Sequence, residues 1–133
     1  ELKAKASTSI KALLVEDIEV CRLVLSMFLL RLHYEVTLAM NGKEAVDLFL
    51  EGKKFGIVLF DKDMPVMIGP EAIVKIRAIG ETDVKIVGVS ADNHAMEAFM
   101  SVGADLFVPK PMSMEALGPI VQDVINKKKN DMV

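Results

Sequence analysis

The sequence predicts an α/β fold in which a five-stranded parallel sheet is covered by helices on both faces. Short apolar runs alternate with longer segments whose apolar residues recur at helical spacing, which is typical of strand–helix–strand units. The run at residues 57–60 is apolar throughout, as expected of a strand buried on both faces, and it leads directly into Asp61. With 133 residues and a hydrophobic fraction of 52%, the chain is the size of one domain with a substantial core.

Five strands are expected, and each is a short apolar run bounded by turn or polar residues. They lie at residues 12–15, 34–38, 55–60, 85–89 and 106–108. The second run alternates apolar and polar residues, which indicates a strand with one wetter face near an edge of the sheet. The third run ends before Pro65, because proline has no N–H to donate to a strand ladder.

Five helices are expected, one after each strand, and each has a start or stop signal. They occupy residues 18–32, 41–51, 69–80, 92–102 and 113–126, with capping residues included. Asn41 is a good N-cap, and Glu44 three residues later completes a pattern typical of a capping box. Pro70 occupies the favoured first position of the third helix. The remaining signals are Asp92 or Asn93 as caps of the fourth helix, Gly103 as its stop, and Ser113 as the cap of the fifth.

Composition and charge argue against several classes of protein. The net charge of -3 gives no electrostatic support for nucleic-acid binding, and no stretch is long and apolar enough to cross a bilayer. The single cysteine, Cys21, cannot form an internal disulfide, so a reducing compartment is expected. We expect an intracellular protein, cytoplasmic or also nuclear, that is a monomer and binds neither nucleic acid nor membrane. Residues 1–9 are expected to be a flexible tail and residues 128–133 a second tail, around one domain at residues 10–127.

The notable polar residues follow the ends of predicted strands. They are Glu16 and Asp17 after the first strand, Asp61 after the third, Ser90 after the fourth and Lys110 after the fifth. The carboxyl ends of parallel strands meet at one edge of the sheet, and ligands bind there at the switch point in strand order. Any one of these residues alone is typical of a cap or a surface charge. Their shared placement predicts a functional site.

Carboxylates and a lysine at this edge are suited to phosphoryl chemistry. Three carboxylates close together repel one another, and Mg²⁺, which takes carboxylate, carbonyl and water oxygens, would relieve that repulsion. The backbone carbonyl of Asp63 is a further candidate ligand. The candidate phosphate-binding groups are the Lys110 ammonium, the Ser90 hydroxyl and the backbone N–H groups of Lys62 and Ala91. Asp61 would then be a carboxylate nucleophile able to form an aspartyl-phosphate.

The same residues, in the same order, resemble the receiver domain of two-component response regulators. The matching positions are Glu16-Asp17, Asp61 within the Asp-Lys-Asp-Met-Pro stretch at 61–65, Gly69, Ser90-Ala91 and Lys110-Pro111. The stretch at 61–65 and the lack of a recognisable output domain are most similar to short, receiver-only plant response regulators of the type-C kind. Ile68 departs from the pattern, because this family usually has a polar residue before the glycine.

The resemblance implies a flavodoxin-like sheet with strand order 2-1-3-4-5 and a place in a His-to-Asp phosphorelay. Asp61 would accept a phosphoryl group from the phosphohistidine of a histidine-containing phosphotransfer protein or a histidine kinase. Mg²⁺ would be held by the acidic residues Glu16, Asp17, Asp61 and Asp63. Ser90 and Phe107 would form a switch pair, and a cis Lys110–Pro111 bond is implied. The domain would be a phosphate sink or a signalling switch, with no enzymatic activity beyond its own phosphorylation and dephosphorylation.

Three other interpretations stay open on the sequence. A haloacid-dehalogenase-like phosphohydrolase also follows a buried strand with Asp-x-Asp, here Asp61 and Asp63, and has a serine and a lysine at later strand ends. That family needs further acidic ligands after the lysine, and it leaves Glu16-Asp17 unexplained. The chain can also be a receiver fragment of a hybrid histidine kinase. A third interpretation, a receiver-like binding module that is not phosphorylated, is disfavoured by the intact acidic trio and lysine.

The first predicted helix carries more apolar residues than one buried face needs. Ten of the fourteen residues at 19–32 are apolar, and eight of them form two stripes at helical spacing. The expected core face is Cys21, Leu25, Phe28 and Leu32. The second set, here named the docking stripe, is Val20, Leu23, Met27 and Leu30. We interpret the docking stripe as the surface that binds the phosphodonor, and the alternative is a helix that is simply more buried.

Overall fold

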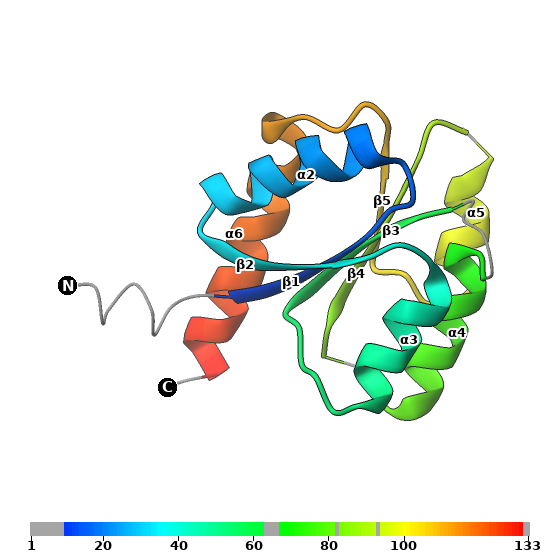
Figure 1. Ribbon diagram of the computed structural model, residues 1–133. Helices are drawn as coiled ribbons and strands as arrows, with labels where there is room; N and C mark the ends of the chain where they lie inside the picture. The colour runs from blue at the N-terminus through cyan, green and yellow to red at the C-terminus, as the bar shows by residue number, and fades with distance from the viewer. Residues whose placement is uncertain (1–9, 63–66, 82, 93, 132–133) are drawn as a thin grey trace.

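A computed structural model describes residues 10–62, 67–81, 83–92 and 94–131. Within them a five-stranded parallel sheet runs through the centre of the molecule (Figure 1). Its strands are β1 (Ile10–Val15), β2 (Tyr34–Ala39), β3 (Ile57–Asp61), β4 (Lys85–Ser90) and β5 (Leu106–Pro109). The strand order β2-β1-β3-β4-β5 confirms the predicted doubly wound fold, and β2 occupies an edge as its alternating sequence indicated.

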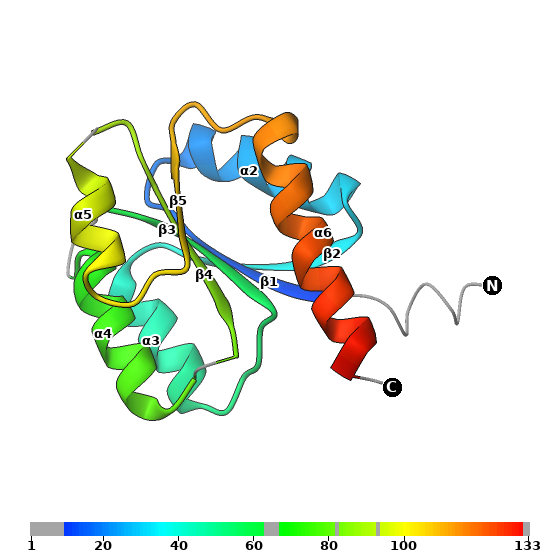
Figure 2. The same ribbon diagram turned by 180° about the vertical axis from the view of Figure 1, so that it is seen from behind.

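Helices cover both faces of this sheet. They are α2 (Glu19–Arg31), α3 (Gly42–Leu50), α4 (Gly69–Ile79), α5 (Ala95–Met100) and α6 (Met114–Asp131). Helices α2 and α6 lie on one face, and α3, α4 and α5 lie on the other (Figures 1 and 2). Side chains alternate along β3, so Leu59 packs in the α2–α6 layer and Phe60 packs in the α3–α5 layer. Both are almost completely buried, which explains the unbroken apolar run before Asp61.

Two helix starts follow the predicted capping residues. The Asn41 side chain accepts a hydrogen bond from the Glu44 N–H at 2.9 Å, and the Glu44 carboxylate accepts one from the Met40 N–H at 2.9 Å. This reciprocal pair confirms the capping box, with the return bond displaced by one residue. Ser113 Oγ accepts a hydrogen bond from the Ala116 N–H at 3.2 Å, which confirms the cap of the last helix.

Two strands begin two residues away from their predicted starts. Phe55 is buried as expected, but it packs on Phe49 with ring centroids 5.4 Å apart, and β3 begins only at Ile57. Phe55 is therefore apolar because its ring packs on Phe49, and not because it belongs to the sheet. β1 begins earlier than predicted, at Ile10, because that residue is paired in register with Tyr34, the first residue of β2.

The last two helices also differ from the prediction, α6 at its end and α5 (Ala95–Met100) at both ends, because α5 was expected to run to residue 102. α6 runs to Asp131 rather than ending near residue 126, because lysine is a good helix former and the basic run continues the helix. The prediction that Asp92 caps α5 is wrong, because His94 is the N-cap; the Asp92 carboxylate instead accepts a hydrogen bond from the His94 N–H at 2.9 Å just before the helix. The other predicted cap, Asn93, lies outside the described residues. Within the described ranges, the helices are all too short or too polar to cross a membrane.

The strand order places the carboxyl ends of β1 and β3 side by side. From β1 the chain winds outward to β2 and then returns past β1 to β3, so the direction of winding reverses between β1 and β3. Val15 and Phe60 are paired in register, and the next residues, Glu16 and Asp61, therefore leave the sheet at the same level. A ligand crevice is expected outside such a reversal point.

Candidate functional site

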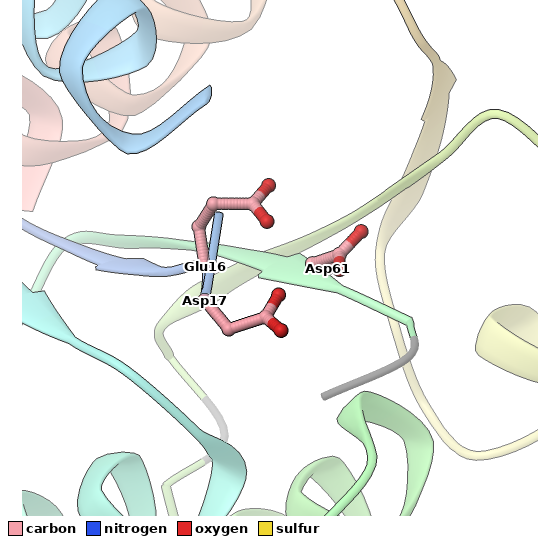
Figure 3. Close-up of side chains that lie close together, drawn as sticks. All are labelled: Glu16, Asp17 and Asp61. Atoms are coloured by element: carbon pink, nitrogen blue, oxygen red, sulfur yellow. The ribbon is translucent and has the colours of Figure 1, made fainter. Parts of the chain in front are cut away.

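Three carboxylates meet at the edge of the sheet where the strand order reverses. Glu16 and Asp17 directly follow β1, and Asp61 is the last residue of β3. One carboxylate oxygen from each residue lies within 4.8 Å of the other two, and Figure 3 shows the three side chains close together. The fold therefore brings together the acidic group that was predicted from the strand ends.

Lys110 joins two of these carboxylates from a distant part of the chain. Its ammonium Nζ lies 2.9 Å from Glu16 Oε1 and 3.1 Å from Asp61 Oδ1. The Lys110 N–H donates to the Ser90 carbonyl at 2.9 Å, and the Lys110–Pro111 bond is cis, as the family resemblance implied. Burial lowers the pKa of Lys110, but hydrogen bonds to Glu16 and Asp61 outweigh burial and raise that pKa overall. The ammonium therefore stays charged.

Asp61 lies in surroundings that disfavour its charged form. Burial raises the pKa of its carboxyl group, and the charge of Glu16 raises it further, while hydrogen bonds from Lys110 and from the Lys62 N–H only partly offset these effects. Glu16 itself is only 1% exposed. The Lys110 ammonium contacts Glu16 and Asp61, and its single positive charge leaves the three carboxylates with a net negative charge that a cation would neutralise.

Asp17 has a buried oxygen that is suited to bind a metal ion. Its Oδ1 is buried and has no hydrogen-bond partner among the described residues. An unsatisfied buried acceptor costs about 1–3 kcal/mol, and a charged one costs more. Mg²⁺ prefers oxygen ligands and takes one or two carboxylates together with waters and phosphate oxygens. The residues at this edge fit Mg²⁺, and Asp63, whose carbonyl was predicted as a further ligand, lies outside the described residues.

The predicted phosphate-binding groups lie at or beside this cluster. The Lys62 N–H already donates to the Asp61 carboxylate, and the Lys62 ammonium lies 3.4 Å from Asp92 Oδ2. Ser90 is only 6% exposed at the end of β4, and its Oγ accepts a hydrogen bond from the Asp92 N–H at 3.0 Å. Ala91 is exposed directly after β4. Lys110 and the Lys62 N–H therefore contact Asp61 directly, whereas the Ser90 hydroxyl is hydrogen-bonded to Asp92 in the loop that follows β4.

Phe107, the second member of the predicted switch pair, lies on the strand next to Ser90. In register Phe107 is opposite Gly88, and Pro109 is opposite Ser90. The Phe107 ring is half-buried and packs on Phe99, with ring centroids 6.0 Å apart. Ser90 and Phe107 therefore occupy adjacent strands, and the Phe107 ring packs in the layer formed by α3, α4 and α5.

The docking stripe is exposed along α2. Val20, Leu23, Met27 and Leu30 are exposed by 70%, 63%, 50% and 58%. The interpretation that this helix is simply more buried is therefore wrong. Leu25 and Leu29 are the buried residues of the helix, and Leu29 belonged to neither predicted stripe. The other predicted core residues, Cys21, Phe28 and Leu32, are only half-buried.

Arg22 contacts this site, although the sequence did not single it out. Its guanidinium Nη1 donates to the Glu16 carbonyl at 2.9 Å and to the Asp17 carbonyl at 3.2 Å. Only its spacing could have pointed to this contact. Arg22 lies one helical turn after Ile18, and Ile18 directly follows the acidic pair, so the Arg22 side chain can reach back to that pair.

Gly69 packs directly against the backbone of Asp61. A Cβ atom at this position would meet the Asp61 carbonyl oxygen and would lie 3.2 Å from Phe99 Cε1. We expect Gly69→Ala to lower the free energy of unfolding by about 1–3 kcal/mol, because overpacking forces the backbone to shift. Urea unfolding followed by circular dichroism would measure this change.

Gly118 in α6 provides the matched control for that substitution. Apart from the backbone of its own helix and its chain neighbours, no described atom lies within 4 Å of a Cβ placed at Gly118, so Gly118→Ala should be neutral or stabilise the fold by up to about 1 kcal/mol. Equal unfolding free energies for the two variants would contradict the tight packing of Gly69 against Asp61.

Comparison with known proteins identifies the class of this protein. Residues 12–122 match the response regulator receiver domain family, and the chain belongs to that family. It is 55% identical over 121 residues to the two-component response regulator ORR42 of Oryza sativa subsp. japonica, and the match covers 91% of each chain. The plant resemblance inferred from the 61–65 stretch is therefore confirmed.

Solved structures agree with this fold. The receiver domain of sensor histidine kinase PA1611 from Pseudomonas aeruginosa, which has a magnesium ion coordinated in its active site cleft, matches with a TM-score of 0.80 and 31% identity. That match covers 89% of this chain and 98% of the other. A chain in the co-crystal structure of the Saccharomyces cerevisiae histidine phosphotransfer protein Ypd1 and the receiver domain of Ssk1 has a TM-score of 0.82 at 26% identity, covering 90% and 91%. The haloacid-dehalogenase-like alternative finds no support in these comparisons.

Proposed function

We propose that this receiver domain accepts a phosphoryl group on Asp61 from a phosphohistidine of its partner. The observation that carries the proposal is the cluster at the reversal point, where the Asp61 carboxylate contacts Lys110 and lies beside Glu16 and Asp17. One carboxylate oxygen of Asp61 attacks phosphorus, the phosphorus–nitrogen bond breaks, and the imidazole keeps the bonding electrons. An aspartyl-phosphate forms without any other covalent change in the protein.

Glu16, Asp17 and Asp61 would hold Mg²⁺ through their carboxylates, and Asp63 through its backbone carbonyl. Bound Mg²⁺ would supply positive charge for the phosphoryl oxygens. The protein's own part is to keep the three carboxylates within 4.8 Å of one another and to bury Glu16 and the free oxygen of Asp17 away from water.

Four further groups would bind the transferred phosphate. They are the Lys110 ammonium, the Ser90 hydroxyl and the backbone N–H groups of Lys62 and Ala91. Ser90 Oγ accepts a hydrogen bond from the Asp92 N–H, so its own O–H can still donate to a phosphate oxygen, and the hydroxyl would move toward Asp61 to do so. We propose that Phe107 turns inward as Ser90 moves, so the two residues act as a switch pair.

The partner would be a histidine-containing phosphotransfer protein or a histidine kinase that docks on α2. The docking stripe of Val20, Leu23, Met27 and Leu30 is exposed, and α2 begins just after the acidic pair, so a helical partner lying on it would be near Asp61. We place this exchange inside the cell, in the cytoplasm or nucleus, and assign it to a monomer whose receiver unit is residues 10–127. The domain would then be a phosphate sink or a signalling switch that also dephosphorylates itself.

The proposal is tested by phosphorylation with a small-molecule donor, acetyl phosphate, with intact mass as the measurement. In the presence of Mg²⁺ the protein should gain one phosphoryl group. Chelation by EDTA should lower the rate of labelling by at least about tenfold, because the carboxylates would repel the incoming phosphoryl group.

The matched control restores ionic strength with KCl, which should leave labelling low, whereas added MgCl₂ should restore it. A labelling rate that EDTA does not change would contradict the metal-dependent function. A second phosphoryl group would show that another residue also accepts.

A further inference from the structure

Arg22 holds the backbone of the acidic turn rather than an acidic side chain. The turn joins β1 to α2, and Arg22 lies in the first part of α2 with its side chain half-buried. Its Nη1 donates to the carbonyl oxygens of two consecutive residues, Glu16 at 2.9 Å and Asp17 at 3.2 Å. The side chain therefore folds back over the start of its own helix and bridges the two carbonyls.

The turn needs such support because its two carboxylates must point to one place. Consecutive side chains of an extended strand point to opposite faces, so Glu16 and Asp17 converge on Asp61 only if the backbone leaves the strand at a fixed angle. Besides the Lys110 ammonium, two other contacts help to fix Glu16. Its N–H donates to the Ala39 carbonyl at 3.1 Å, and its carboxylate accepts from the Ile18 N–H at 3.3 Å. The Asp17 carbonyl accepts only from Arg22 in the described part of the chain.

The charge of Arg22 and its geometry act on a bound cation in opposite directions. A guanidinium beside a metal site repels the cation, so loss of that charge alone would tighten Mg²⁺ binding. Loss of the two hydrogen bonds would let the turn move and would weaken Mg²⁺ binding, because partners that orient metal ligands are worth about 10- to 100-fold in affinity. The sign of the change in affinity therefore tells which effect dominates.

We propose that Arg22 is a positioning residue that holds the Glu16–Asp17 turn in its metal-binding conformation and thereby sets the affinity for Mg²⁺. This inference rests on the proposed metal-dependent function. It concerns the unphosphorylated protein, so it can be measured without any phosphodonor.

Two variants at this position separate geometry from charge. Arg22→Met keeps much of the aliphatic stem and removes both hydrogen bonds and the charge. Arg22→Lys keeps the charge and the N–H donors, but its side chain is one bond shorter and lacks the rigid guanidinium plane, so it holds the two carbonyls less firmly. Isothermal titration with MgCl₂ at constant ionic strength should show binding about tenfold weaker for Arg22→Met and an intermediate loss for Arg22→Lys.

A positioning role has a second signature that a loss of charge would not produce. The amide NMR signals of Glu16 and Asp17 in the metal-free protein should shift or broaden in both variants, because the turn loses its anchor. Arg31→Met is the matched control, since Arg31 is an exposed arginine in the last turn of the same helix. It should leave both the Mg²⁺ affinity and these two signals unchanged.

The outcomes are distinct. Tighter Mg²⁺ binding by Arg22→Met, or unchanged affinity in both variants, would overturn the positioning role while leaving the proposed function standing. Failure of the unmodified protein to bind Mg²⁺ would instead overturn the metal-dependent function. If Arg22→Met is too unstable to titrate, the intermediate loss and the shifted amide signals of Arg22→Lys still decide the question, and wild-type values for both would refute the role.

Discussion

Asp61→Asn should abolish phosphorylation while leaving the protein folded. Asparagine keeps the shape of the side chain but cannot attack phosphorus, so no labelling by acetyl phosphate should be detected by intact mass. Asp47→Asn is the matched control, because Asp47 is a half-exposed carboxylate on α3 that pairs with Lys43. It should be labelled at the wild-type rate, and labelling of the Asp61 variant at that rate would show that another residue is the acceptor.

The same substitution should stabilise the metal-free protein near neutral pH. Burial and Glu16 raise the pKa of Asp61 in the folded state, so the unfolded chain loses this proton at a lower pH than the folded one. The wild type therefore loses stability relative to Asp61→Asn as the pH rises from the ordinary aspartate pKa through the raised value. Urea unfolding in EDTA across this range should show that the variant's excess in free energy of unfolding over the wild type grows with pH. An excess that shrinks with pH would contradict a raised pKa of Asp61 in the folded state.

Leu23→Glu combined with Met27→Glu should block transfer from a phosphotransfer protein without affecting acetyl phosphate. Both side chains are at least half exposed, so the fold should tolerate the change. In the complex, however, the two charges would replace apolar contacts with the partner that are worth more than about 1 kcal/mol each. Transfer at limiting partner concentration should fall by about tenfold or more. Labelling by the small molecule should stay within about twofold of the wild type, because the substitutions lie outside the acidic cluster.

A matched pair of substitutions on the opposite layer provides the control. Leu50 on α3 and Val74 on α4 are exposed by 65% and 50%, and Leu50→Glu combined with Val74→Glu adds the same charge. This control should not impair transfer from either donor. Equal loss of transfer in both double variants would indicate a general effect of charge, and loss of acetyl phosphate labelling in the α2 variant would show that the stripe supports the site rather than the partner.

The placement of the acidic cluster was predictable because it follows from local patterns and one topological rule. The unbroken apolar run before Asp61 indicates a doubly buried strand, and parallel strands end at a common edge. These two facts were enough to predict that Glu16, Asp17 and Lys110 lie near Asp61. The exposed docking stripe was also predictable, because a helix on one face of a sheet buries only part of its circumference.

The contacts made by long polar side chains were not predictable in the same way. Arg22 bonds to carbonyl groups, and every residue has a carbonyl, so no residue pattern marks the partner. Lys110 was expected at the phosphate, but in this structure it also contacts Glu16, because both side chains are long enough to meet across the edge. Leu29 was missed for a related reason, since the centre of a buried face depends on how the helix is rotated against the sheet.

The bond between Lys110 and Glu16 joins residues that are 94 positions apart in the sequence. Contacts of such long separation carry a large loop-closure cost and form only when the intervening strands are in place. A growing chain that has not yet reached β5 therefore has Asp61 but lacks the lysine beside it. The capacity to accept phosphate would arise only in the completed fold, so unfinished or partly unfolded chains would not compete for the donor.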